Sequence, residues 1–298
     1  MKPRHIESKA MKNAALNPFA SPAAKACLAL ALLSSIQNSS AAVVAWDDSF
    51  TGGSLNSNLN VSNNGGGTVT QTGGQLIMTG TTAGDGRFAS VWTNATSTGA
   101  TTIGGNLAYN YMANAVTSTF NLASLVSTSG QANTNQRPTF YYSIGQDGGA
   151  PRNYYGIGMD YGVSFNIENV LGTGWRIVGG TANASVFTEN FTGNISGVPT
   201  SVTYDINNTS ATITLAGATF TGGGGATASF SFNDLSGVGA FTQRSLAFGV
   251  YNRGNNIIST ATLDSFNVTV VPEPSSFAML IAGVAGVVLR RRRSRCTA

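Results

Sequence analysis

The chain has 298 residues, of which 42% are hydrophobic and only 9% are charged, and its formal net charge is +4. Disordered chains normally combine low hydrophobicity with high net charge, so this composition indicates a folded protein. Residues 1–42 and 271–298 each carry a net charge of +4, whereas residues 43–270 carry −4. The middle region therefore lacks the basic surface that nucleic-acid binding requires, and we expect no nucleic-acid partner.

Several kinds of catalytic site are excluded from the middle region by its composition. Residues 43–270 contain no Cys, no His and no Lys. Disulfides, His or Cys metal sites, Ser-His-Asp and Cys-His nucleophiles, Schiff-base lysines and the phosphate-loop lysine all require one of these residues. Carboxylates, Tyr, Arg and an oxygen-ligated Ca²⁺ remain as available chemistry. We expect no metal and no cofactor.

Residues 1–42 have the organisation of a secretory signal peptide. A basic segment up to Lys25 is followed by the apolar run of residues 26–33 and by the small residues Ser40, Ala41 and Ala42. These three parts correspond to the basic region, the hydrophobic region and the cleavage site of such signals. We expect cleavage after Ala42, with Ala41 as the alternative. A short buried helix is the structural alternative for the apolar run.

The middle region, residues 43–270, is predicted to be one antiparallel β-sandwich. Its apolar residues recur with period two, as in Val202, Tyr204 and Ile206, which is the pattern of strands with one buried face. Clusters of Gly, Asn, Ser and Thr separate the runs, as turns require, and no long helical period interrupts them. Predicted strands include residues 43–50, 75–79, 88–93, 107–112, 139–144, 154–159, 163–167, 175–178, 202–206, 211–215, 229–232, 246–251 and 266–270.

The two ends of this region are similar to the concanavalin-like jelly roll of lectins, laminin-G modules and many glycosidases. The similarity lies in Trp46–Phe50, the turn and strand of Gly73–Met78, Phe248–Tyr251 and Leu263–Val268. It implies an all-β jelly-roll fold. Enzymes, binding modules and spacers all use that fold, so the resemblance does not select a function.

A glycosidase on this fold would need two carboxylates facing one groove. The only glutamates of the middle region are Glu168 and Glu189, and Asp160 could approach Glu168 across a hairpin. Asp160 precedes Tyr-Gly and is more simply a turn residue. We therefore expect no catalytic residues and no enzymatic activity.

A sugar-binding site is the alternative with more residues to support it. Aromatic residues concentrate in one stretch of about 35 residues, and flat aromatic faces beside polar groups are surfaces on which sugar rings stack. Adjacent tyrosines in a strand can equally point one ring to the core and one to solvent. The candidate sugar-binding residues are Tyr141, Tyr142, Tyr154, Tyr155 and Trp175.

The C-terminal segment, residues 271–298, is predicted to be a sorting and anchor segment. Val271-Pro272-Glu273-Pro274 is followed by an apolar stretch, residues 277–289, and by Arg290, Arg291, Arg292 and Arg293. Thirteen helical residues cover about 20 Å of a hydrocarbon core near 30 Å. The span becomes sufficient if residues 275–276 lie at one interface and the arginines extend to the cytoplasmic interface. A plain tail anchor is the alternative interpretation.

This tail resembles the PEP-CTERM sorting signal of Gram-negative bacteria that produce extracellular polysaccharide. The resemblance implies that exosortase recognises Pro272, Glu273 and Pro274 and removes the arginine cluster. It also implies that residues 275–289 cross the inner membrane before processing, and that the protein is then delivered to the cell surface or the extracellular matrix. From the whole sequence we expect a non-enzymatic structural or adhesive protein associated with exopolysaccharide. A carbohydrate-binding module or a glycosidase is the alternative.

Overall fold

The computed structural model describes residues 42–55, 59–81, 87–94, 102–103, 106–107, 114–129, 131–146, 161–183, 186–232, 244–254 and 256–272. All regular secondary structure in these ranges is β-structure. Ser40–Glu273 form one compact unit. Within the described ranges, no helix is long and apolar enough to span a membrane. Residues 1–41 of the predicted signal peptide and the predicted span 275–289 lie outside these ranges.

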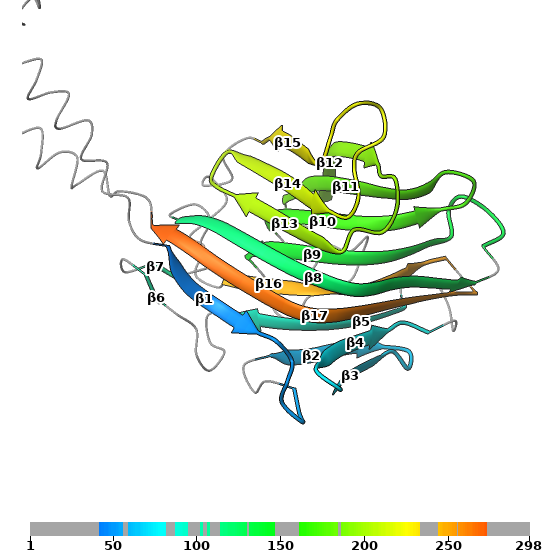
Figure 1. The fold of residues 1–298 in the computed structure, drawn as a ribbon, viewed down its shortest axis with the longest axis horizontal. Helices are drawn as coiled ribbons and strands as arrows, with labels where there is room; N and C mark the ends of the chain where they lie inside the picture. The colour runs from blue at the N-terminus through cyan, green and yellow to red at the C-terminus, as the bar shows by residue number, and fades with distance from the viewer. Residues whose placement is uncertain are drawn as a thin grey trace, which may run out of the picture. The chain divides into compact units, whose positions relative to one another are not determined.

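Most strands belong to two antiparallel sheets, which we name sheet A and sheet B (Figure 1). Sheet A has eight strands in the order β15-β14-β13-β8-β17-β4-β3, with β1 paired to β17. Its strands are β1 (Val43–Asp48), β3 (Thr68–Thr72), β4 (Gln75–Thr79), β8 (Asn114–Ser129), β13 (Ser201–Ile206), β14 (Ser210–Ala216), β15 (Thr227–Ser231) and β17 (Ile257–Pro272).

Sheet B has seven strands in the order β12-β11-β10-β9-β16-β5-β2. Its strands are β2 (Asn60–Asn64), β5 (Arg87–Asn94), β9 (Arg137–Gln146), β10 (Tyr161–Val170), β11 (Gly174–Asn183), β12 (Val186–Asn194) and β16 (Arg244–Arg253). A separate two-stranded sheet joins β6 (Thr102–Ile103) and β7 (Asn106–Leu107).

Aromatic rings from both sheets meet in the core between them. Phe120 of β8 lies 5.2 Å from the ring of Tyr142 and 5.1 Å from that of Phe248, both of sheet B. Phe165 of β10 stacks on Tyr204 of β13 with ring centroids 4.3 Å apart. Large apolar surface removed from water is the main favourable term in folding. These contacts confirm the predicted sandwich, because they join the inner faces of two antiparallel sheets.

The two longest strands, β8 and β17, are adjacent in sheet A and each contain 16 residues. The sequence predicted only the last third of β17 and none of β8. β8 is rich in Ser, Thr and Ala, and one of its inward positions is Ser118, which interrupts the apolar alternation. The Ser118 hydroxyl is buried at 2.7 Å from the Tyr142 hydroxyl, so a hydrogen bond to the opposite sheet replaces an apolar contact.

Candidate functional site

The outer face of sheet B, which points away from sheet A, carries buried polar residues on β9 and β10. Successive strand residues point to opposite faces, so Ser143 lies on the outer face while Tyr142 and Ile144 enter the core. Ser143 is directly opposite Ser164 of β10, and their hydroxyl oxygens are 2.7 Å apart. Both serines are almost fully buried. Polar side chains on the face that does not meet sheet A therefore satisfy each other away from water.

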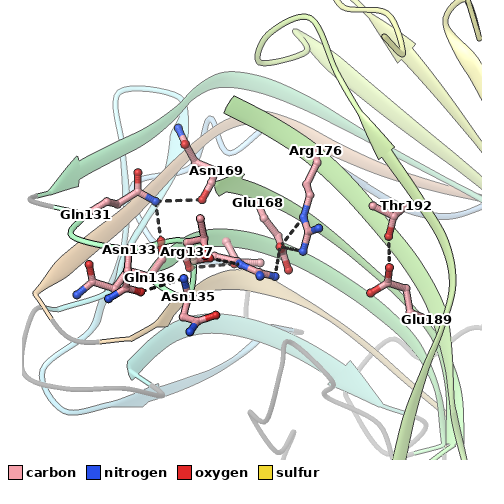
Figure 2. A network of polar contacts seen from close by, with 12 residues as sticks. Gln131, Asn133, Asn135, Gln136, Arg137, Glu168, Asn169, Arg176, Glu189 and Thr192 are labelled. Carbon is pink, nitrogen blue, oxygen red and sulfur yellow. Dashed lines mark hydrogen bonds and ion pairs between the residues drawn. The ribbon is translucent and has the colours of Figure 1, made fainter. Parts of the chain in front are cut away.

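At one end of this face, the carboxylate of Glu168 forms ion pairs with two arginines (Figure 2). Arg176 of β11 is directly opposite Glu168 of β10, and its Nε and Nη2 atoms lie 3.0 Å and 2.9 Å from Glu168 Oε2. Arg137 of β9 donates from Nη1 to the same oxygen at 3.2 Å. The side chains of Glu168, Arg137 and Arg176 are only 7%, 16% and 19% exposed. Three neighbouring strands are thus joined through one buried carboxylate oxygen.

The loop before β9 holds Arg137 in place. Arg137 Nε donates to the Thr134 carbonyl oxygen at 2.7 Å. Gln131 Nε2 donates to the Gln136 carbonyl at 2.6 Å and to the Asn169 carbonyl at 3.1 Å, which ties the loop to β10 (Figure 2). Burial is the main cause that lowers the pKa of Arg137, against the opposing attraction of Glu168. The guanidinium is therefore fixed by both its charge partner and its backbone contact.

This arrangement fits a structural ion pair better than a hydrolytic pair of carboxylates. A glycosidase needs one carboxyl group to exchange protons and a second one across the same groove. Glu168 faces two cations, and Glu189 accepts a hydrogen bond from Thr192 on β12. Asp160, the other predicted partner of Glu168, lies outside the described residues. In the part of the chain that the structure describes, no three His, Cys, Asp or Glu residues are grouped as a metal site would require.

Two of the predicted sugar-binding rings are buried, which corrects their assignment to a sugar-stacking surface. Tyr142 lies in the main core, and Tyr141 packs on the outer face of sheet B against Ala247, Tyr251 and Phe88. Their exposed fractions are 0% and 1%. Burial raises the pKa of Tyr141 to about 12, with a hydrogen bond to Ser90 acting in the opposite direction. Neither ring presents a face to a sugar, because both faces of sheet B are covered at β9.

The remaining predicted sugar-binding residues divide into two groups. Tyr154 and Tyr155 lie outside the described residues. Trp175 of β11 is half-buried and packs against the edge of the core. It lines a shallow pocket between the ends of the two sheets, together with Leu125, Val126, Pro138, Thr139, Phe140, Val250, Ser259 and Thr260.

A buried polar network stands behind this pocket. Asn252 Oδ1 accepts hydrogen bonds from the Ser259 backbone nitrogen at 2.9 Å and from its hydroxyl at 2.6 Å. Asn252 Nδ2 donates to the Ile257 carbonyl oxygen at 2.8 Å. The Ser259 hydroxyl is also 3.2 Å from the Thr139 backbone nitrogen, which joins the two sheets. The polar groups beside the pocket are therefore hydrogen-bonded to one another, and Trp175 is the partly exposed aromatic residue of its lining.

The end of β17 carries the first residues of the predicted tail. Val271 and Pro272 pair with Ala115 and Asn114 of β8, while Val270 pairs with Val43 of β1 on the other side. Val270 is fully buried. Glu273, Pro274 and the arginines from Arg290 to Arg293 lie outside the described residues. The folded sandwich thus extends to the residue that directly precedes Glu273.

Comparison with protein families identifies the tail. Residues 270–293 match the family model of the PEP-CTERM protein-sorting motif. The chain carries this motif, as the sequence resemblance predicted, and the motif marks it as an exported protein that is handled at the membrane by exosortase. No curated protein matches the sequence.

Solved structures similar to this chain include lectins and a glycoside hydrolase. The winged bean acidic lectin is 12% identical, with a TM-score of 0.45, over 78% of this chain and 100% of the lectin. Lectin II from Ulex europaeus is 10% identical, with a TM-score of 0.42, over 76% of this chain and 97% of the lectin. The GH43 protein BlXynB from Bacillus licheniformis is 9% identical, with a TM-score of 0.43, over 74% of this chain and 38% of that protein. Likenesses at this level are of general sandwich architecture alone.

The two arginines that pair with Glu168, Arg137 and Arg176, were not among the predicted site residues, and Glu168 was predicted only as a possible catalytic carboxylate. The spacing of Glu168 and Arg176 across the short turn of residues 171–173 was the available signal, because residues that flank a hairpin turn symmetrically face each other.

Proposed function

We propose that this protein is a non-enzymatic structural or adhesive component of the bacterial cell surface or matrix. In this proposal, exosortase processes its C-terminal tail, and the mature sandwich associates with exopolysaccharide. The observation that carries the proposal is the sorting motif, which begins inside the last strand of the sandwich and continues into the arginine cluster. Because the sandwich ends where the sorting signal begins, the tail can be exchanged or removed while the sandwich stays folded.

The state of the carboxylates supports the non-enzymatic part of the proposal. Glu168 is paired with two arginines and holds three strands together. Glu189 is exposed and contacts Thr192 of its own strand. A pair of carboxylates opposing each other across a groove, the arrangement that glycoside hydrolysis requires, is not formed by these two residues.

Processing can be tested in the producing bacterium with matched glutamate variants. Glu273→Ala, or deletion of Arg290–Arg293, is expected to leave the protein with its full C-terminal tail in the membrane fraction. Glu189→Ala is the control, because Glu189 lies on an exposed strand surface, and it is expected to be processed normally. Intact mass spectrometry measures the outcome. If both tail variants gave the same mature mass as the unaltered protein, apart from the mass of the altered residues, processing by exosortase would be contradicted.

A sugar-binding role is the second candidate, and the pocket at Trp175 favours it. The half-buried indole of Trp175 borders this pocket, and an aromatic face is a surface on which a sugar ring stacks. The Ser259 and Thr260 hydroxyls beside it are hydrogen-bonded to Asn252 and Thr79, so binding would depend on the indole. Binding of the mature protein to a polysaccharide array, with and without Ca²⁺, tests this candidate. Loss of binding in Trp175→Ala, with retention in Trp175→Phe, would assign the pocket. Cleavage of a bound glycan would instead favour the glycosidase alternative.

A further inference from the structure

The strand ends that lead into both targeting segments lie side by side in sheet A. β1 and β17 are antiparallel, so the first residue of β1 is next to the end of β17, with Val43 opposite Val270 (Figure 1). Val43 directly follows the predicted signal-peptide cleavage site, and Val270 is the first residue of the sorting motif. The two segments of the precursor that are predicted to contact the membrane therefore leave the sandwich at the same edge.

The tether between this edge and the apolar stretch is short. β17 ends at Pro272, and the apolar stretch begins at Phe277, so residues 273–276 form the whole connection. Five Cα-to-Cα steps reach at most about 18 Å when fully extended. The headgroup layer on one side of a bilayer occupies roughly 5–8 Å of that reach. The strand ends are thus held close to the membrane surface while the tail is intact.

Two exposed valines lie at this same edge. Val44 is 57% exposed and Val271 is 38% exposed, and they are two of the five large hydrophobic residues that are exposed among the described residues. Val44 is opposite Thr269, and Val271 follows Thr269 by two positions, so both side chains lie on the outer face of sheet A. We name Val44 and Val271 the edge valines. Isolated exposed valines need no explanation, but these two occupy diagonal positions on neighbouring strands at the start of the membrane tether.

Charge restricts how this edge can meet a bilayer. Asp47 and Asp205 are also on the outer face of sheet A and are exposed. Asp47 is opposite Asn267, which lies farther from the strand end than the edge valines. Asp205 is opposite Thr117 of β8, and Thr117 is in turn opposite Thr269 of β17, so Asp205 lies two strands away from Thr269. Contact through the flat face would bring both carboxylates against anionic headgroups, which repel them. Contact through the strand ends on the side of β1 brings the valines into the interface. It leaves Asp47 behind them and Asp205, which lies in the row of Val44 and Thr269, two strands to the side.

We propose that the edge formed by the ends of β17 and β1 is a membrane-docking surface of the precursor, with the edge valines in contact with the lipid headgroup region. This inference rests on the proposed function, because it requires the tail to be inserted in a membrane. Its consequence is that exosortase meets a motif presented by a folded, membrane-adjacent strand. Release of the tail would then free the docking surface together with the protein.

Site-directed fluorescence of the full-length precursor tests this proposal. Single cysteines at Val44, Val271 and Val126 are labelled with an environment-sensitive dye in a background in which Cys27 and Cys296 are serine. Val126 is the matched control: it is 41% exposed on β8, the strand paired with β17, and lies about 35 Å along β8 from Ala115, the partner of Val271. The precursor is reconstituted into phosphatidylethanolamine–phosphatidylglycerol vesicles that carry nitroxide-labelled headgroups.

The proposal predicts several-fold stronger nitroxide quenching at positions 44 and 271 than at position 126. A variant with twelve Gly-Ser residues inserted between Pro274 and Ser275 is expected to float with the vesicles but to lose most of this difference. Equal quenching at all three positions in a floating precursor would overturn the docking surface and leave the sorting proposal intact. A precursor that does not float with the vesicles would overturn the membrane tether and the docking surface together. Reduced tail processing in Val44→Ser, a residue outside the sorting motif, without a difference in quenching would assign the edge to a protein contact and also overturn the lipid proposal.

Discussion

The outer faces of the two sheets both carry polar residues but differ in how exposed these residues are. On sheet A, the outward residues of β13 and β14 are exposed or half-buried, and their hydroxyl and carboxylate groups reach water. On sheet B, the outward residues of β9 and β10 are as polar, but they are buried. Serines there pair with serines, and a glutamate pairs with two arginines. Polar alternation in a sequence thus indicates which residues leave the core, but not whether they reach solvent.

Because of this difference, substitutions on the outer face of sheet B should destabilise the protein more than substitutions on the outer face of sheet A. A buried hydrogen bond or ion pair costs the full desolvation of the remaining partner when one member is removed. An exposed pair costs little, because water replaces the lost partner. Matched substitutions on the two faces should therefore differ in their effect on the free energy of unfolding.

The largest difference is expected between Glu168→Gln and Asp205→Asn. Glu168→Gln leaves two arginines around a neutral amide in a buried site, which should lower the free energy of unfolding by about 3–5 kcal/mol. Asp205 on sheet A is exposed and hydrogen-bonded to Thr117, and its substitution should change stability by less than about 0.5 kcal/mol. Urea unfolding of the mature protein measures both. Equal effects would show that burial of the outer face of sheet B has no energetic consequence.

The alkaline stability of the protein depends on Tyr141 on the buried outer face. Its pKa in the folded protein is about 12 and its ordinary value is 10.0, so between these pH values the unfolded chain loses the proton and the native chain keeps it. The free energy of unfolding should fall by roughly 2–3 kcal/mol over this range, and the contribution is complete below pH 10. Tyr141→Phe should flatten this pH dependence. An identical pH slope in the variant would contradict the burial of Tyr141.

The smallest difference is expected between two matched hydroxyl pairs. Ser143 and Ser164 are 2.7 Å apart on sheet B and buried, whereas Thr212 and Ser229 are 2.8 Å apart on sheet A and exposed. Ser164→Ala should destabilise by about 1 kcal/mol, and Ser229→Ala should have almost no effect. Thermal unfolding of the two variants under identical conditions resolves the difference. A larger loss in Ser229→Ala would reverse the ranking of the two faces.

The sequence predicted the fold class because several strands of sheet A, such as β4, β13 and β14, follow the simple alternation of buried and exposed residues. Predicted residues 75–79 coincide with β4, and 202–206 and 211–215 lie within β13 and β14. β2, β3, β8 and β12 were missed, since their Thr, Ser and Asn residues dilute the apolar signal. The length of β17 was missed for the same reason, because Ile257–Leu263 contains Ser and Thr at both inward and outward positions.

The candidate sites were predicted less well than the fold. The tail motif could be identified because a sorting signal is a contiguous stretch of residues. Tyr141 and Tyr142 were assigned to a sugar surface because aromatic residues concentrate in that stretch of the sequence, and the alternative was one ring in the core and one in solvent. The outward ring, Tyr141, is instead buried against Tyr251 and Ala247, which are far from it in sequence and adjacent only through the pairing of β9 and β16. Information of that kind lies in the topology rather than in the local sequence.

The central claim is that the protein is exported and that its tail is processed at the sorting motif. It is tested most directly by the intact mass and terminal peptides of the protein released at the surface of the producing cells. The account predicts a mature chain that begins near Val43, ends close to Pro274 and lacks the apolar stretch and the arginine cluster. Cells without exosortase should retain the tail. A surface protein that still carries residues 275–298 in normal cells would contradict the account.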